Sequence, residues 1–218
     1  MLRIYQFFAL LLVMGVVLSS CNRRPSSTAD IPRHLPQSYK ISVAPFTQPL
    51  NGGQLITGRV PEMQGQIPLD ELNALDMELR GVLMTMTKRQ YDFIPVGELR
   101  EELAMAPSTG QPSALPLWLN YAVKHKAEYL LVPMVLDWHE REGSEAGVEK
   151  SAHVRLEMFL LNVKNGQVLD RAVYEEKQVG LVDNLLGVKD FVRRKGQWVT
   201  SRQLAKEGME ATIKELGL

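Results

Sequence analysis

The stretch that most constrains the fold is YLLVPMVLDW, residues 129–138, an almost unbroken run of apolar side chains. A run without a polar face is typical of a strand that is covered on both sides. We therefore expect a sheet with further structure packed on each of its faces. Proline cannot donate a hydrogen bond to a neighbouring strand, so Pro133 predicts an edge position or a bulge at that point.

A hairpin is predicted directly after this strand. The segments HVRLEMFLLNV and VLDRAVYEEKQ flank Lys164-Asn165-Gly166-Gln167, and Asn-Gly is the strongest two-residue hairpin turn signal. On the first segment, apolar side chains alternate with polar ones; the apolar set is Val154, Leu156, Met158 and Leu160, and the polar set is His153, Arg155 and Glu157. A simple turn would place Arg155 opposite Glu176 and Leu156 opposite Glu175.

Helical spacing of apolar residues appears in several segments. The first stripe begins after Asp70 and comprises Leu72, Leu75, Leu79, Val82, Leu83 and Met86. A second comprises Leu181, Leu185, Val188 and Val192. Residues 200–203 have capping-box spacing, and they open a predicted helix whose inward residues are Ala205, Met209, Ile213 and Leu216. Shorter elements are predicted as strands at 39–46 and 92–96 and as helices at 98–104 and around 118–125.

The predicted order is therefore strand, helix, strand, helix, helix, strand, hairpin, helices. This order indicates an α/β (α+β) fold, with a single mixed sheet of about five strands flanked by helices. Between the strand at 39–46 and the helix at 70 lies a long Gly/Pro/Gln-rich loop. Loops of this length are uncommon within a compact domain and are usually functional or disordered. We expect loop 47–68 to face a partner, in preference to the 181–192 stripe, because helical stripes are usually part of a core.

The N-terminus carries the run FFALLLVMGVVLSSC, from Phe7 to Cys21. Its apolar part is too short to cross a bilayer, which takes about 20 residues. With Arg3 before it and small residues after it, the run has the layout of a secretory signal peptide. A core helix is the alternative, but the run has no polar face and a proline-containing segment follows at once.

The end of that run, Leu18-Ser19-Ser20-Cys21, resembles the lipobox of bacterial lipoproteins. The resemblance implies recognition of Leu18, Ser19 and Ser20 by the signal peptidase, cleavage before Cys21, a lipid thioether on its sulfur and acylation, for instance with palmitate, of its amino group. Several acyl chains would hold the protein almost permanently on a membrane. Asn22 in place of Asp implies the periplasmic face of the outer membrane, if the cell is Gram-negative.

Three regions follow from these patterns: a signal peptide at 1–20, a lipidated, disordered tether at 21–37, and a single periplasmic α/β domain with C-terminal helices at 38–218. The whole chain has 25 Lys+Arg and 25 Asp+Glu. This even balance gives no support for a nucleic-acid binder. Cys21 is the only cysteine, so its lipidation would leave no thiol for a disulfide or for nucleophilic catalysis.

The element order, an early VAPF at 43–46 and AEYLLV at 127–132 resemble a periplasmic superfamily. It includes the curli-secretion lipoprotein, the penicillin-binding-protein activator lipoproteins and the N-terminal domain of the Tol system's propeller protein. The likeness covers about residues 39–179 and implies a small binding or assembly domain. Lys126 replaces the glycine usual in this superfamily. The chain also lacks paired membrane-spanning strands, which argues against a secretion channel.

Candidate catalytic and metal motifs are weak. His139-Glu140-Arg141-Glu142, with His153 downstream, lacks the His-Glu-x-x-His spacing of a helical metal site, and solvated polar residues account for it. In Gly143-Ser144-Glu145-Ala146-Gly147 the serine is one place away from the centre of a nucleophile elbow. We therefore predict no catalytic residue, no metal, no cofactor and no enzymatic activity.

Arg193-Arg194-Lys195 with Trp198 is a local basic-aromatic cluster and a candidate partner contact. The alternative is a set of cations that favour a helix C-terminus. The function predicted from the sequence is that of a membrane-anchored, non-enzymatic binding or assembly factor for another envelope protein. The alternatives are a self-assembling structural subunit, joined through sheet edges or terminal helices, and a cell-wall hydrolase. The oligomeric state is left open.

Overall fold

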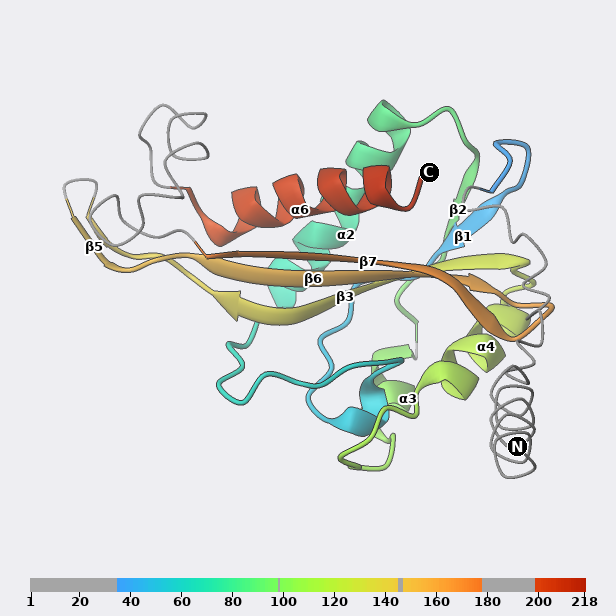
Figure 1. Cartoon of the computed structure of the whole chain (residues 1–218), viewed down its shortest axis with the longest axis horizontal. Helices are drawn as coiled ribbons and strands as arrows, with labels where there is room; N and C mark the ends of the chain where they lie inside the picture. The colour runs from blue at the N-terminus through green and yellow to red at the C-terminus, as the bar shows by residue number, and fades with distance from the viewer. Residues whose placement is uncertain (1–34, 98, 145–146, 178–198) are drawn as a thin grey trace, which may run out of the picture. The chain divides into compact units, whose positions relative to one another are not determined.

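The computed structural model describes residues 35–97, 99–144, 147–177 and 199–218 (Figure 1). Its main sheet has five strands in the order β2-β1-β3-β6-β7. Strand β1 (Ile41–Val43) pairs in parallel with β2 (Tyr91–Phe93) and with β3 (Tyr129–His139). Strand β6 (His153–Asn162) pairs antiparallel with β3 and with β7 (Gln167–Lys177). The predicted single mixed sheet is confirmed. Strands β4 (Glu142–Ser144) and β5 (Gly147–Lys150) form a separate small hairpin.

Helices α2 (Leu69–Met86) and α6 (Ser201–Glu215) cover one face of the sheet (Figure 1). The predicted stripe of α2 is buried from Leu72 to Leu83, whereas Met86, in its last turn, is exposed. Thr200 caps α6, because its Oγ1 accepts a hydrogen bond from the Gln203 backbone N–H at 3.2 Å, as the capping-box spacing predicted. The predicted inward residues are buried: Ala205, Met209 and Ile213 in α6, and Leu216 directly after its end.

Helices α3 (Leu99–Ala104) and α4 (Leu115–Lys124) lie on the opposite face, together with the 3-10 turn η1 (Gly52–Gln54) (Figure 1). Their core includes Trp118 and Tyr121 of α4, which pack with one row of β3 and β6 side chains: Leu130, Val132, Met134, Leu136, Phe159 and Leu161. Strand β3 is therefore covered on both sides, as its apolar run predicted. Among the described helices, none is both long and apolar enough to cross a lipid bilayer.

Pro133 lies in the middle of the sheet, so the edge position allowed by the sequence is wrong. The chain after β1 accommodates it instead. Val43 pairs with Leu131, whereas Thr47 bridges Met134, so this chain carries an extra residue beside Pro133. Pairing then resumes, since Val135 N donates to Thr47 O at 2.9 Å. Strand β3 has its own bulge slightly further on, between Val135 and Asp137.

The hairpin strands are confirmed, but the predicted register is wrong by one residue. Arg155 faces Glu175, and Leu156 faces Tyr174. The loop is wider than a two-residue turn, because the last pair is Asn162 with Gln167, and a bulge between Leu160 and Leu161 recovers part of the offset. Gly166 has φ +64°, a conformation that glycine adopts without strain.

Arg89 fastens the start of the described chain to the domain. Its guanidinium donates to the carbonyl oxygens of Leu35 and Pro36 at 2.7 Å each, and to that of Tyr39 at 3.0 Å. Only 7% of Arg89 is exposed, so these carbonyls offset part of the cost of burying a cation. The predicted stripe at 181–192 lies outside the described residues.

Candidate functional site

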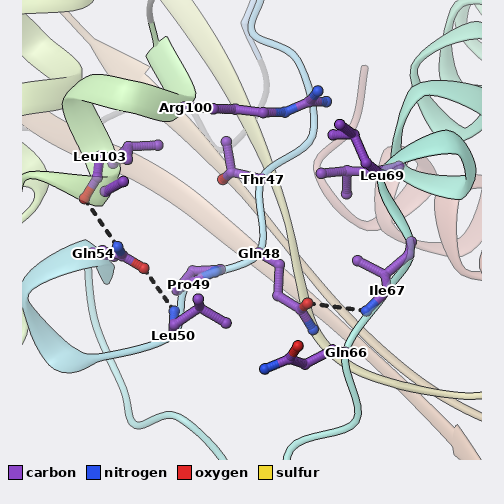
Figure 2. A pocket seen from close by; sticks show the side chains of 12 residues that line it. Thr47, Gln48, Pro49, Leu50, Gln54, Gln66, Ile67, Leu69, Arg100 and Leu103 are labelled. Carbon is purple, nitrogen blue, oxygen red and sulfur yellow. Dashed lines mark hydrogen bonds between the residues drawn. The ribbon is translucent and has the colours of Figure 1, made fainter.

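Loop 47–68 leaves the sheet after β1, runs on the side that carries α3, and returns to the start of α2 (Figure 1). Between the loop, α3 and the first turn of α2 lies a groove of about 270 Å³ (Figure 2). Its walls are largely apolar, formed by Pro49, Leu50, Ile67, Leu69, Leu72 and Leu103. The preferred partner-facing segment of the sequence is thus one wall of a concave site.

Two glutamines give the loop its shape. Gln48 joins the two arms of the loop, because its Oε1 accepts from Ile67 N at 3.0 Å and its Nε2 donates to Gly65 O at 2.8 Å. Gln54 fixes the loop to α3, since its Oε1 accepts from Leu50 N at 2.7 Å and its Nε2 donates to Leu103 O at 2.9 Å (Figure 2). The glutamines of this Gly/Pro/Gln-rich segment therefore hold the groove open in a defined shape.

Arg100 extends along one side of the groove, with its guanidinium end toward Leu69 (Figure 2). Its Nη1 donates to Asn73 Oδ1 at 2.8 Å, and its Nη2 lies 3.3 Å from Phe46 O and 3.4 Å from Asp76 Oδ2. Among the described residues, Arg100 Nε and Thr47 Oγ1 are buried without a hydrogen-bond partner. Both residues line the groove, but these two polar atoms are covered by neighbouring atoms and do not reach its surface.

Asp76 forms an ion pair with Arg100 but does not itself line the groove. Burial raises the pKa of the Asp76 carboxyl to about 6, although the Phe46 backbone N–H, 2.6 Å away, and the Arg100 guanidinium act in the opposite direction. The carboxyl therefore takes up a proton as the pH falls through about 6. Because ionised Asp76 is a partner of Arg100, its protonation weakens one of the contacts that fix the guanidinium.

A second polar cluster lies where the loop passes the end of β3. Gly65 N donates to Asp137 Oδ1 at 2.7 Å. His139 and His153 were predicted to be solvated polar residues, but strand pairing places them opposite each other, with parallel rings 5.8 Å apart. The sequence reasoning missed Asp137, which lies between them. The sequence feature that could have identified Asp137 is its position as an acidic residue at the end of the apolar run.

Two of the sets of residues singled out in the sequence lie outside the described residues. These are the lipobox residues Leu18, Ser19, Ser20 and Cys21, and the basic-aromatic cluster Arg193, Arg194, Lys195 and Trp198. Arg100, Asp76 and Thr47 were not predicted, because no local pattern relates an arginine in α3 to a carboxylate in α2 and a hydroxyl after β1.

The chain matches no protein-family model and no curated protein. Among solved structures it is similar to the PelC dodecamer from Paraburkholderia phytofirmans, at 14% identity over 84% of this chain and 90% of that one, with a TM-score of 0.47. It is also similar to the lipoprotein GNA1162 from Neisseria meningitidis, at 14% identity over 72% and 96%, with a TM-score of 0.37. A third is the LpoB C-terminal domain from Salmonella enterica, at 14% identity over 63% and 82%, with a TM-score of 0.34. These scores are below 0.5, so the function proposed next rests on the geometry of this chain.

Proposed function

We propose that this chain is a lipid-anchored, non-enzymatic binding or assembly factor that holds a segment of another cell-envelope protein in the groove beneath loop 47–68. The observation that carries the proposal is the groove itself, whose walls are largely apolar and also include Arg100 and Thr47. Its occupant is a short extended peptide. An apolar side chain of this peptide would lie between Leu50 and Leu69, and a carbonyl or carboxylate oxygen would lie near Arg100.

The size of the groove favours a peptide segment over a cofactor. Its volume of about 270 Å³ is just below the range of about 300–1,000 Å³ typical of small-molecule sites. Leu50 and Leu69 are 55% and 62% exposed on its rim. Covering them would remove apolar surface from water, at about 25 cal/mol per Å². Exposed leucines beside a preformed hollow are suited to gripping a partner's side chain.

The polar atoms of the groove specify what the occupant must offer. A buried donor without an acceptor costs about 1–3 kcal/mol. Arg100 Nε is covered, so a small shift of this side chain would have to expose it. A peptide carbonyl or carboxylate oxygen could then remove that cost and form a charge-assisted hydrogen bond. Thr47 Oγ1 can donate to a carbonyl or accept from an amide N–H. An extended peptide backbone supplies both kinds of group.

The hydrolase alternative has no support at this groove. The described residues that line it include no Asp, Glu or His, so it offers no pair of groups for general acid–base hydrolysis. Asp76 contacts Arg100 but does not line the groove. Binding requires none of these groups.

Self-assembly through the long outer strand is also less well supported than binding of a different protein. Strand β7 is at one end of the sheet order, and its charged residues are Asp170, Arg171, Glu175, Glu176 and Lys177. Charged side chains on an edge strand oppose pairing with a second copy. The strand at the other end, β2, has three residues, which gives a short edge for pairing.

The lipid anchor is tested through Cys21. Replacement by serine (Cys21→Ser) removes the sulfur that would carry the thioether, so we expect an uncleaved precursor and loss of the mature, detergent-extractable form. Cell fractionation and mass spectrometry of the N-terminus measure this. A serine variant that is cleaved before residue 21 and remains on membranes as the wild type does would contradict the anchor.

The groove is tested with Leu50→Asp and Leu69→Glu in the full lipidated chain. Both side chains are exposed, so we expect each variant to keep the wild-type unfolding midpoint and to lose at least ~10-fold of the crosslinked envelope partner, because a buried leucine anchor contributes about 1.5–3 kcal/mol. Matched controls are Met63→Asp in the same loop and Met84→Glu in the same helix, since both methionines are exposed and lie outside the groove. Equal recovery by groove and control variants would contradict the proposal.

A further inference from the structure

At the ends of β3 and β6, on the side reached by loop 47–68, three metal-ligating side chains converge. Asp137, His139 and His153 each offer one ligand atom, and these atoms all lie within 4.8 Å of one another. His139 Nε2 is 3.0 Å from Asp137 Oδ1, and His153 Nδ1 is 3.1 Å from Asp137 Oδ2. Around a four-coordinate zinc ion with bonds of about 2.0 Å, ligand atoms are about 3.3 Å apart. Small side-chain shifts would therefore convert the cluster into a coordination shell.

Local backbone geometry explains why these residues meet. A regular strand would send Asp137 and His139 to one face, opposite to that of Leu136 and Trp138. The bulge between Val135 and Asp137 changes this alternation, so that Leu136 packs in the α3/α4 core while Trp138 packs in the α2/α6 core. The antiparallel register then places His139 directly opposite His153. The two imidazoles are stacked, with an interplanar angle of 5°.

Two carboxylates face the ring nitrogens of His153, an arrangement that suits either an imidazolium, which donates from both nitrogens, or a bound metal ion. One ring nitrogen faces Asp137, and the other, Nε2, lies 3.3 Å from Glu175 Oε1. A neutral imidazole has a single N–H, so it can donate to only one of these two carboxylates. A metal ion between Nδ1 and Asp137 would leave the N–H on Nε2 for Glu175. Metal-bound histidines usually donate their second nitrogen to a carboxylate or carbonyl in this way.

The other contacts fix the carboxylate and leave one side of the cluster open. Asp137 Oδ1 accepts from Gly65 N at 2.7 Å and from Trp138 N at 3.1 Å. The side chain of Asp137 is 7% exposed, that of His153 is 18% and that of His139 is 44%. An ion held by these groups would reach solvent past His139, where water could complete its coordination. Two imidazoles and one carboxylate favour zinc and neighbouring transition metals over magnesium or calcium.

We infer that Asp137, His139 and His153 bind one zinc-class divalent ion, with Glu175 as a positioning residue for His153. The site is independent of the peptide groove, although loop 47–68 contributes to both. Gly65 permits this close approach of the loop, because a Cβ at that position would lie 2.1 Å from Trp138 O and 2.9 Å from His139 Cε1. Gly65 N donates to Asp137. By fixing Asp137, zinc would therefore also help to hold the loop against β3.

The test is calorimetric titration of the chelator-treated full chain, in detergent, with Zn²⁺ alone. We expect one ion per chain, a raised unfolding temperature, and no comparable response to Mg²⁺. His139→Gln and His153→Gln should each weaken binding by more than ~10-fold, and Glu175→Gln by about 10-fold, as found for residues that orient metal ligands. His125→Gln is the control, because this exposed histidine lies outside the cluster.

Cobalt substitution gives a second readout that does not depend on stability. Co²⁺ in the wild-type chain should produce the visible absorption of a low-coordinate nitrogen–oxygen site, and His139→Gln should remove it. Failure of the wild-type chain to bind zinc in the titration would overturn the inference. So would zinc binding that His139→Gln and His153→Gln leave unchanged, since the ion would then be held elsewhere.

Discussion

The two faces of the sheet are built on different principles. On the α2/α6 face, long helices with regular apolar stripes pack on the alternating residues of β6. The opposite face combines the short helices α3 and α4 with an irregular loop, a groove and several buried polar groups. Glu157, for example, is fully buried there, and both of its oxygens accept from Arg171, at 2.7 and 3.0 Å. The α2/α6 face therefore provides mainly apolar burial, and the opposite face adds to its own apolar core groups that can recognise a ligand.

This difference between the two faces predicts where substitutions should change stability and where they should change binding. Apolar burial is the main stabilising contribution to a fold, so the α2/α6 face should respond to loss of volume. Buried polar groups add little net stability when they are paired, but they are costly when left unpaired. The loop face should therefore respond to changes in charge, pH or bound ligand.

The largest effect is expected for Leu75→Ala in α2. Leu75 is fully buried in the core that α2 and α6 form on the sheet, and truncating a buried leucine to alanine typically costs about 2–5 kcal/mol. We expect the free energy of unfolding to fall by about 3 kcal/mol in a urea titration. Met84→Ala in the same helix removes an exposed side chain and should change it by less than about 0.5 kcal/mol. Equal effects of the two variants would contradict the claim that apolar burial on the α2/α6 face stabilises the fold.

A smaller, pH-dependent effect is expected for Asp76→Asn. Because the pKa of folded Asp76 is raised from 3.8 to about 6, the folded state binds more protons than the unfolded state between these values. This carboxyl therefore makes the free energy of unfolding fall as the pH rises through that window. The full pKa difference corresponds to about 3 kcal/mol, and solvent screening of a partly exposed group reduces it to about 1 kcal/mol.

Asparagine cannot ionise, so Asp76→Asn removes this dependence. Relative to the wild type, the variant should gain about 1 kcal/mol in unfolding free energy between pH 4 and pH 7, measured by urea titration at each pH. A relative loss over the same range would show that the Phe46 N–H and Arg100 outweigh burial in setting the pKa of Asp76. It would also place Asp76 among the stabilising ion pairs.

The α2/α6 face could be predicted from the sequence, because its elements depend on local periodicity. The stripe from Leu72 to Leu83 and the capping residues Thr200 and Gln203 are visible within short windows. The sheet and its hairpin followed from the apolar run of β3 and from Asn165-Gly166. The register did not, because the loop width and the bulge between Leu160 and Leu161 depend on packing that the turn residues do not specify.

On the loop face, the helices α3 and α4 were predicted from the sequence, but the groove could be predicted only by its location in loop 47–68. The length of loop 47–68 marked it as functional, but the contacts that shape the groove join residues far apart in the chain, such as Gln54 with Leu103 and Arg100 with Asp76. The histidine cluster depends on a bulge in β3 and on strand pairing. Spacing along the sequence indicates neither the bulge nor the pairing. For this reason His139 and His153 were predicted to be solvated polar residues.

The most direct test of a peptide-binding loop face is site-specific photocrosslinking in growing cells. A photoreactive amino acid is placed at Leu50 or Leu69 on the groove rim, or at Met84 on the exposed side of α2. Two rim positions that crosslink to the same envelope protein, at the same segment, with no such product from position 84, are what the account predicts. Products from position 84 that match those from positions 50 and 69, or no protein product from either rim position, would contradict it.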